Sequence, residues 1–434
     1  MISHRQILAI AVPIVISNVS TPLIGLVDTA VMGRLDDAAY IGAIALGSMI
    51  LTFLFWGLGF LRMSTTALTA QAHGANNNDE VRASLGRAMA VGLAAGAVLI
   101  MLQSPLNSIA FGLVEATDRV ESLSSEYFNI RIWSAPAVLS NYVLLGWFIG
   151  LGQSGKALMI QLFLNGVNLI LDIYFVLGLG YDVAGVGAAS VIAEYSAFAL
   201  GGWLMMRELR RRPGVFDLAN LLAPEKLRRT MIINRDIMIR TLCLIFAFSW
   251  FTAQAAKSGD IILAANAILL NFITLAAFFL DGFAVAAETL VGQAMGANNR
   301  KAFSRVVKLS TLWAFAISIF VSLVFWFAGD FIIAFLTVNT EVRNSASIYL
   351  PWAAAAPVVA ILAYQLDGIY NGVTRTVEMR NLMILSVAFY LAAWWMLVPL
   401  YGNHGLWAAL MLFFIARGLT LAVRYPALVR ATFV

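Results

Sequence analysis

Four polar residues in otherwise apolar segments are the first candidates for chemistry in this sequence. Asp28 lies in "PLIGLVDTAVMG", Asn168 and Asp172 lie in "NGVNLILDIYFV", and Ser190 lies in the next apolar segment. Asn168 precedes Asp172 by four residues, so a helix would place both on one face. Two carboxylates held a few ångströms apart resist ionising together. An Asp28–Asp172 pair could therefore hold a proton near neutral pH or bind a monovalent cation between its oxygens.

A carboxylate at mid-membrane depth costs about 3 kcal/mol on insertion scales, and such acids usually have a function. We therefore interpret Asp28 and Asp172 as a site of cation or proton coupling. The alternative is that polar side chains only join helices through hydrogen bonds, which explains Asn168 and Ser190 at least as well. Na⁺ is possible at Asp28, Asn168 and Asp172, but the sequence predicts no firm metal site.

The second half of the chain carries acids of its own in apolar segments. Asp281 and Glu288 are seven residues apart, or two helical turns, so they share a face. Together with Asp367 and Arg62 they are candidates for a substrate cavity or a second charge site that meets a cationic substrate. The sequence leaves the role of Glu194 open between the same substrate-binding function and an ion pair with an arginine. The competing interpretation pairs these acids with an intramembrane arginine: Arg62, Arg240 or Arg417.

Motifs of soluble catalysis are missing or incomplete. "GLGQSGKA" (Gly150 to Ala157) matches the G-x-x-x-x-G-K part of a phosphate-binding loop, but Ala157 stands where the motif needs Ser or Thr for magnesium. No HExxH, GxSxG or paired cysteine motif occurs, and Cys243 is the single cysteine. The three histidines lie in loops or near termini and form no metal-binding pattern. We predict a protein that is not an enzyme and has no cofactor.

The elements that position these residues follow from composition. Of the 434 residues, 61% are hydrophobic and only 12% are charged, a balance that leaves too little polar surface for a soluble domain. Apolar runs long enough to cross a bilayer recur along the whole chain, and they lack the alternating pattern of a β-barrel. We predict twelve transmembrane helices, at about 7–32, 40–71, 82–103, 121–151, 157–180, 185–208, 231–257, 261–295, 303–328, 342–372, 378–400 and 404–426.

The positive charges predict the orientation of these helices. With the N-terminus in the cytoplasm, the opposite loops hold only Arg34, Arg119, Lys257 and Arg343. The cytoplasmic loops hold many more: Arg82, Arg87, Lys156, Arg207, Arg210, Arg211, Arg212, Lys226, Arg228, Arg229, Arg300, Lys301, Arg305, Lys308, Arg375 and Arg380. Positive residues concentrate on the cytoplasmic side of membrane proteins. We therefore expect a multi-pass protein of a bacterial-type inner (plasma) membrane, with both termini cytoplasmic, no nucleic-acid partner, and the lipid bilayer as its surroundings.

The chain also repeats itself. "TAQAHGANNN" (Thr69 to Asn78) returns as "VGQAMGANNR" (Val291 to Arg300), 222 positions later (291 − 69). Two weaker matches near this offset make chance a poor explanation. We predict two parallel six-helix units around a central cavity. The N-terminal lobe would span 1–209, the cytoplasmic connecting loop 210–230 and the C-terminal lobe 231–434.

With these motifs in place, the chain resembles the MATE family of exporters (multidrug and toxic compound extrusion), in its DinF-like branch. The resemblance covers essentially the whole length. It is carried by "PLIGLVDTAVMGRL", "GFLRMSTTALTAQAHG", "NLILDIYFVLGLG" with "GVGAAS", and "AAETLVGQAMGA". It implies twelve helices in two pseudo-symmetric bundles, and export of bulky cationic or amphiphilic drug-like compounds in exchange for H⁺ or Na⁺.

The resemblance also implies an ion site in the N-terminal lobe, onto which Asp28, Asn168, Asp172 and Ser190 map. Some relatives in another branch bind sodium through a glutamate in span seven and an aspartate in span ten. Asp367 fits the aspartate, but span seven of this chain has no glutamate. This departure favours the N-lobe carboxylates and, more weakly, protons over sodium.

These features together predict a monomeric antiporter that works by alternating access. Pro13 and Pro22 interrupt the hydrogen-bond ladder of the first span, which could bend there when the carboxylates lose their charge. A flippase for lipid-linked precursors is the main alternative, and an arginine-lined, lipid-sized cavity would favour it. An intramembrane enzyme or a passive channel fits less well, because the sequence has two repeats and no catalytic motif.

Overall fold

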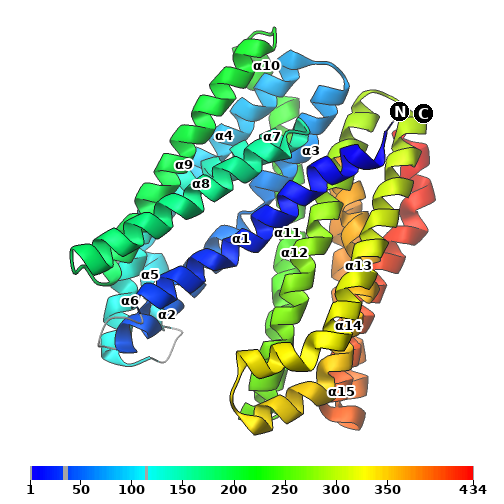
Figure 1. The fold of residues 1–434 in the computed structure, drawn as a ribbon. Helices are drawn as coiled ribbons and strands as arrows, with labels where there is room; N and C mark the ends of the chain where they lie inside the picture. Colours follow the sequence, from blue (N-terminus) through cyan, green and yellow to red (C-terminus); the bar gives the residue numbers. More distant parts are fainter. Residues whose placement is uncertain (1, 33–37, 113–115, 434) are drawn as a thin grey trace. The chain divides into compact units, whose positions relative to one another are not determined.

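The computed structural model describes residues 2–32, 38–112 and 116–433, and no β-strand occurs in those ranges (Figure 1). The side chains of Leu23, Ile24, residues 26–30, Met32, Ala38 and Leu218 also lie outside the description. The chain forms two compact units, Ile16–Thr230 and Met1–Val15 with Met231–Val434. The predicted division into functional lobes at 1–209 and 231–434, with a connecting loop at 210–230, stays a prediction.

The first unit holds the helices that carry Asn168, Asp172 and Ser190. Several of its spans are built from two consecutive elements, such as α2 and α3, which meet at Leu58 and Gly59. Its elements are α1 (His4–Met32) from Ile16 onward, α2 (Ala38–Gly57), α3 (Phe60–Gly74), α4 (Asn78–Met101), α5 (Gln103–Gly112), α6 (Asp118–Arg131), the short 3₁₀ helix η1 (Ile132–Ser134), α7 (Ala135–Gly150), α8 (Ser154–Asp172), the π-helix η2 (Ile173–Gly178), α9 (Val183–Arg211) and α10 (Leu218–Leu221).

The second unit consists of long helices. It takes α11 (Pro224–Ala256) from Met231 onward and adds α12 (Asp260–Gly296), α13 (Arg300–Leu336), α14 (Thr340–Gly372) and α15 (Thr376–Thr432). α15 is not one straight helix, because Gly402 has a φ of 56° and a ψ of −130° within it. This kink, close to Pro399, divides α15 into two membrane spans.

The all-α fold with twelve spans in two six-helix bundles is confirmed. Nine helical stretches of the described chain are long and apolar enough to cross a bilayer, and one of them, α15, contains two spans. α1 and α11, with 29 and 33 residues, complete the twelve. Helices suit this environment because lipid offers no partner for backbone N–H and C=O groups, which must be satisfied within the segment.

The predicted repeat reappears in the backbone. Three pairs of residues with positive φ are each separated by 222 positions, namely Asn76 and Asn298, Gly152 and Thr374, and Gly180 and Gly402 (298 − 76, 374 − 152 and 402 − 180). In the first of these pairs, the asparagine that follows the positive-φ residue caps a helix: Asn77 accepts from the N–H of Glu80, and Asn299 accepts from that of Ala302. The "GANN" motif therefore ends one helix and begins the next in both halves.

Small residues bring helices into close contact at equivalent places in the two units. Gly146 and Gly150 of α7 face the backbone of α3, at the carbonyl groups of Arg62 and Thr66. Gly368 and Gly372 of α14 face the carbonyl groups of Ala284 and Glu288 of α12. Water no longer drives apolar contacts in lipid, so helices associate through such close packing.

We expect Gly368→Ala to destabilise the second unit by about 1–3 kcal/mol, as overpacking of a tight contact does. A β-carbon at Gly368 would overlap the backbone of Ala284, which cannot move aside as a flexible side chain could. The control is Gly202→Ala on α9, where a β-carbon meets nothing within 4 Å. Thermal unfolding in detergent micelles measures both, and equal midpoints for the two variants would contradict this packing argument.

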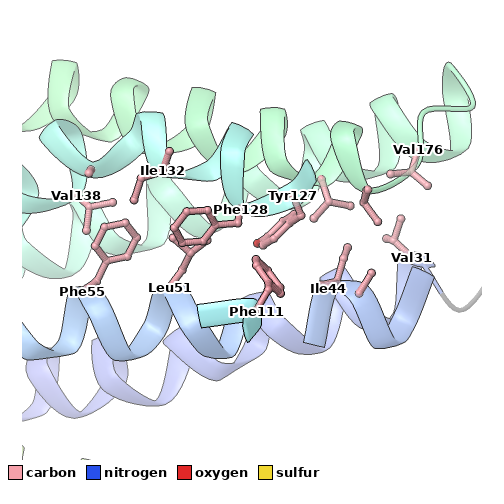
Figure 2. Close-up of a cluster of buried hydrophobic side chains, with 14 residues drawn as sticks. Val31, Ile44, Leu51, Phe55, Phe111, Tyr127, Phe128, Ile132, Val138 and Val176 are labelled. Atoms are coloured by element: carbon pink, nitrogen blue, oxygen red, sulfur yellow. The ribbon is translucent and has the colours of Figure 1, made fainter. Parts of the chain in front are cut away.

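A buried hydrophobic cluster holds α2 against α6 and its continuation in the first unit. Figure 2 shows Leu51 of α2 beside Phe128 of α6. Phe55, one turn further along α2, points toward Val138 of α7. The ring of Phe111 from α5 lies edge-on to that of Phe128, with centroids 6.3 Å apart. The cluster also includes Val176 of η2 and Val183 and Val186 of α9, so the same packing holds the first turns of α9.

Candidate functional site

α8 carries three polar side chains on one face, at Asn165, Asn168 and Asp172. Their spacing of three and four residues places them one above another along the helix. Asp172 is fully buried, and Asn168 is only 2% exposed. α8 ends at Asp172, where the π-helix η2 begins. Because π-helical turns are rare and concentrate at functional sites, this junction singles out Asp172.

Ser190 of α9 faces the same group of residues. Its Oγ accepts a hydrogen bond from Nδ2 of Asn168 at 3.3 Å, and both side chains are buried. The amide oxygen of Asn168 is also buried, and no donor within the described ranges reaches it. Amide, hydroxyl and carboxylate oxygens are the ligands of hard cations. The pair thus presents an unfilled acceptor one helical turn before the carboxylate of Asp172.

Asp28 lies on α1, but its side chain falls outside the described residues. What the structure does give is a link between α1 and α8. Nδ2 of Asn165 donates to the backbone carbonyl oxygen of Ser20 at 3.0 Å. Pro22, two residues further along α1, has no N–H to contribute to the helical ladder. α8 therefore holds α1 close to Pro22, one of its two prolines, and the meeting of Asp28 with Asp172 remains a prediction.

Glu194 lies one turn after Ser190 on α9 and is bound by two other helices. Nδ2 of Asn141, on α7, donates to its carboxylate at 2.9 Å. Nη2 of Arg131, at the end of α6, lies 3.8 Å from the other carboxylate oxygen. Glu194 thus has both an amide and a guanidinium partner, which the sequence did not identify. This arrangement resembles a structural ion pair more than an open binding group.

Arg62, Asp281 and Glu288 are divided between the two units. Arg62 lies on α3 in the first unit and is close enough to Tyr142 to act on it electrostatically. Asp281 and Glu288 lie on α12 in the second unit, where Glu288 is buried and Asp281 is half-buried. Their predicted places in a substrate cavity or second charge site remain predictions.

Asp367 of α14 pairs with two arginines of the second unit. Its Oδ2 accepts from Arg417 of α15 at 2.7 Å and also from Arg240 of α11. Of the three arginines that the sequence offered as partners for acids, Arg240 and Arg417 are therefore those that meet this one. Arginine side chains of the same chain therefore balance the negative charge of Asp367. The part of Asp367 in substrate binding stays a prediction.

Several polar residues of the site were not singled out from the sequence. Asn165 could have been found, because it precedes Asn168 by three residues in the same "NGVNLILD" segment. Asn141 and Arg131 gave no such signal, because they come from other helices than Glu194. The described residues contain no group of three or more His, Cys, Asp or Glu side chains able to hold a metal ion. An ion at Asn168 and Asp172 would rely on amide and hydroxyl oxygens as well as carboxylates.

Comparison with known proteins gives a consistent result over the whole length of the chain. A family model described as MatE matches residues 13–174 and 237–394. The chain is 39% identical to DNA damage-inducible protein F of Escherichia coli (strain K12), over 97% of this chain and 91% of that protein. It is 27% identical to the probable multidrug resistance protein NorM of Rhizobium meliloti (strain 1021), over 98% of this chain and 94% of that protein.

Solved structures share the fold at low sequence identity. The crystal structure of the Vibrio cholerae MATE transporter VcmN in the bent form matches with a TM-score of 0.89 at 19% identity, covering 99% of this chain and 97% of that one. An outward-facing conformation of a multidrug resistance MATE family transporter matches with a TM-score of 0.88 at 16% identity, covering 99% and 96%.

Proposed function

Because this chain belongs to the MATE family of membrane transporters, we propose that it is a secondary active multidrug efflux antiporter. It would export bulky cationic and amphiphilic organic compounds in exchange for H⁺ or Na⁺. The observation that carries the proposal is the buried face of α8, where the carboxylate of Asp172 follows an unfilled amide acceptor at Asn168. A carboxylate whose charge is neutralised during the cycle suits this buried place, because a permanent charge within the membrane is costly.

The coupling step in this proposal is neutralisation of the carboxylates. A proton or a sodium ion enters from outside and binds at Asp28 and Asp172, assisted by the oxygens of Asn168 and Ser190. Once the charge is lost, α1 bends at Pro22, next to the carbonyl of Ser20 that Asn165 holds. Substrate leaves outward, the transporter turns inward, and the ion is released to the cytoplasm.

The energy available to this cycle is sufficient for useful export. One elementary charge moving down about 100 mV releases about 2.3 kcal/mol. At about 1.4 kcal/mol per tenfold change in concentration, this supports an outward gradient of about forty-fold for a substrate without net charge. For a monovalent cationic substrate a one-to-one exchange moves no net charge, so the concentration gradient of the coupling ion alone drives export. A single coupled ion per substrate is therefore enough in principle.

The location of the protein belongs to the same proposal. The excess of Lys and Arg in alternate loops supports cytoplasmic N- and C-termini. The membrane would be a bacterial-type inner membrane. Because the pseudo-symmetric halves of one chain already supply two bundles, a monomer would be the working unit.

Inverted membrane vesicles test the proposal, because export in them appears as uptake of a cationic dye into the lumen. We expect an acidic lumen to drive dye uptake without any sodium gradient, since span seven lacks the glutamate that relatives in another branch use for sodium. A sodium gradient imposed alone, with the higher sodium concentration in the lumen, distinguishes the two coupling ions. Dye uptake under this gradient would identify sodium as the coupling ion. Vesicles without the protein are the control. Dye uptake under neither gradient would contradict antiport.

A further inference from the structure

The outward face of α9 changes character toward the end of the helix. Within residues 192–199, the exposed side chains of α9 are apolar or aromatic. Further along come Trp203, which is 58% exposed, and then three exposed arginines, Arg207, Arg210 and Arg211. Their spacing places these four side chains within about a third of the helix circumference. We call these four residues the arginine stripe.

Within the described residues, no carboxylate pairs with the three arginines of the stripe. The guanidinium of Arg207 lies over the ring of Trp203, 5.7 Å from its centroid. The acid next to Arg207 in the sequence, Glu208, is buried and accepts from Lys156 at 2.6 Å. Glu208 is therefore neutralised inside the protein, and the stripe presents three positive charges on its outer surface.

The loop that follows α9 runs away from the stripe. Arg212 donates through Nε to the buried Glu208 at 2.9 Å. The carbonyl oxygen of Arg212 accepts from Nη2 of Arg82, on α4, at 2.7 Å. The backbone N–H of Val215 then donates to Asp79 of the same helix at 2.8 Å. The loop therefore docks on α4 and leaves the stripe uncovered.

The second unit does not repeat the stripe, although its backbone follows that of the first at an interval of 222 residues. The equivalent positions (425 − 203) hold Tyr425, Val429, Thr432 and Phe433. The repeated helix end therefore does not require three outward arginines. Along α9 the exposed face is first apolar, then carries a tryptophan and then arginines. A bilayer has the same order from its acyl chains through its interface to its headgroups.

We propose that the arginine stripe binds an anionic phospholipid, such as phosphatidylglycerol, in the leaflet at this end of α9. The phosphate would accept from Arg210 and Arg211, because the planar fork of arginine matches two phosphate oxygens. Trp203 would lie at the interface below the headgroup, where tryptophan is enriched. Basic side chains next to the end of a membrane span attract anionic headgroups. The inference concerns lipid binding, so it stands or fails independently of antiport.

Native mass spectrometry of the full-length protein, released from maltoside micelles, tests the inference. The probes are phosphatidylglycerol and phosphatidylcholine with the same acyl chains. We expect the wild type to bind phosphatidylglycerol at least about tenfold more tightly, because each basic side chain near an anionic surface contributes about fivefold. The double variant Arg210→Gln, Arg211→Gln should lose most of this preference.

The matched control removes the same charge from another exposed place. Arg300→Gln with Lys301→Gln, at the start of α13 in the second unit, should keep the preference of the wild type. Both double variants change only exposed side chains, so each should keep the fold.

Four results would overturn the proposal. The first is equal binding of the two lipids by the wild type, and the second is an unchanged preference in the stripe variant. The third is an equal loss in the control variant, because net charge alone would then explain the preference. The fourth is displacement of phosphatidylglycerol by glycerol 3-phosphate at the same concentration, because the site would then belong to a free phosphate compound and not to a lipid.

Discussion

The Asp172→Asn variant is expected to insert normally and to lose ion-coupled export. Asparagine has nearly the volume of aspartate, so the buried junction of α8 and η2 keeps its packing. It cannot change its charge, so the coupling ion has nothing to neutralise. Exchange of one proton for one monovalent cationic dye moves no net charge, so the dye ratio across the membrane should fall from about the imposed proton ratio, tenfold per pH unit, toward unity. Dye accumulation in acid-lumen inverted vesicles measures this ratio.

The matched variant for this prediction is Asp260→Asn. Asp260 is exposed in the first turn of α12 and is remote in sequence from the α8 face. It should leave the dye ratio unchanged. Asp28→Asn should behave as Asp172→Asn does, because the proposal gives both carboxylates to one site. Undiminished accumulation by either of the two site variants, at equal amounts of protein in the membrane, would remove that residue from the coupling site.

Removing the carboxylate of Asp367 is expected to have the largest effect on stability. Asp367→Ala leaves Arg240 and Arg417 buried without their shared acceptor. Breaking a buried ion pair by removing one partner typically costs about 3–5 kcal/mol. Asp281 still acts on Arg240, so we expect the lower part of this range. The free energy of unfolding in mixed micelles with increasing dodecyl sulfate measures the loss.

Replacing the whole cluster tests the reason for this loss. The triple variant Asp367→Leu, Arg240→Met and Arg417→Met removes all three charges, and apolar replacements of buried ion pairs are often neutral. It should therefore be more stable than Asp367→Ala, although it removes more groups. A decrease of less than about 1 kcal/mol in the free energy of unfolding for Asp367→Ala would contradict this explanation. It would show that water already supplies acceptors for the two arginines.

The sequence predicted the fold well because the membrane imposes strong constraints. Apolar length, the distribution of Lys and Arg, and the repeated "GANN" motif were enough to identify twelve helices in two bundles. Finer features were not predicted. The break of α2 and α3 at Leu58 and Gly59 and the π-helix after Asp172 depend on packing between helices. Such packing leaves no periodic trace in a uniformly apolar segment.

The candidate site was predictable only along single helices. The interval of four residues placed Asn168 and Asp172 on one face, since helical geometry fixes that relation. The contact of Asn168 with Ser190 joins two helices, and no spacing rule gives it. The same limit applies to Asp367: the sequence offered three arginines, and only the structure selects Arg240 and Arg417.

The central claim is that binding of the coupling ion at the site on α1, α8 and α9 drives the outward movement of substrate. Proteoliposomes with a pH-sensitive dye in the lumen test it most directly when a cationic substrate is loaded inside and the outside is substrate-free. As the substrate flows out down its gradient, antiport by the wild type should carry protons inward and acidify the lumen. If sodium is the coupling ion, the sodium concentration in the lumen should rise instead. Asp172→Asn should produce neither change. Substrate efflux through the wild type with no proton or sodium movement, or equal ion movement in the variant, would contradict the claim.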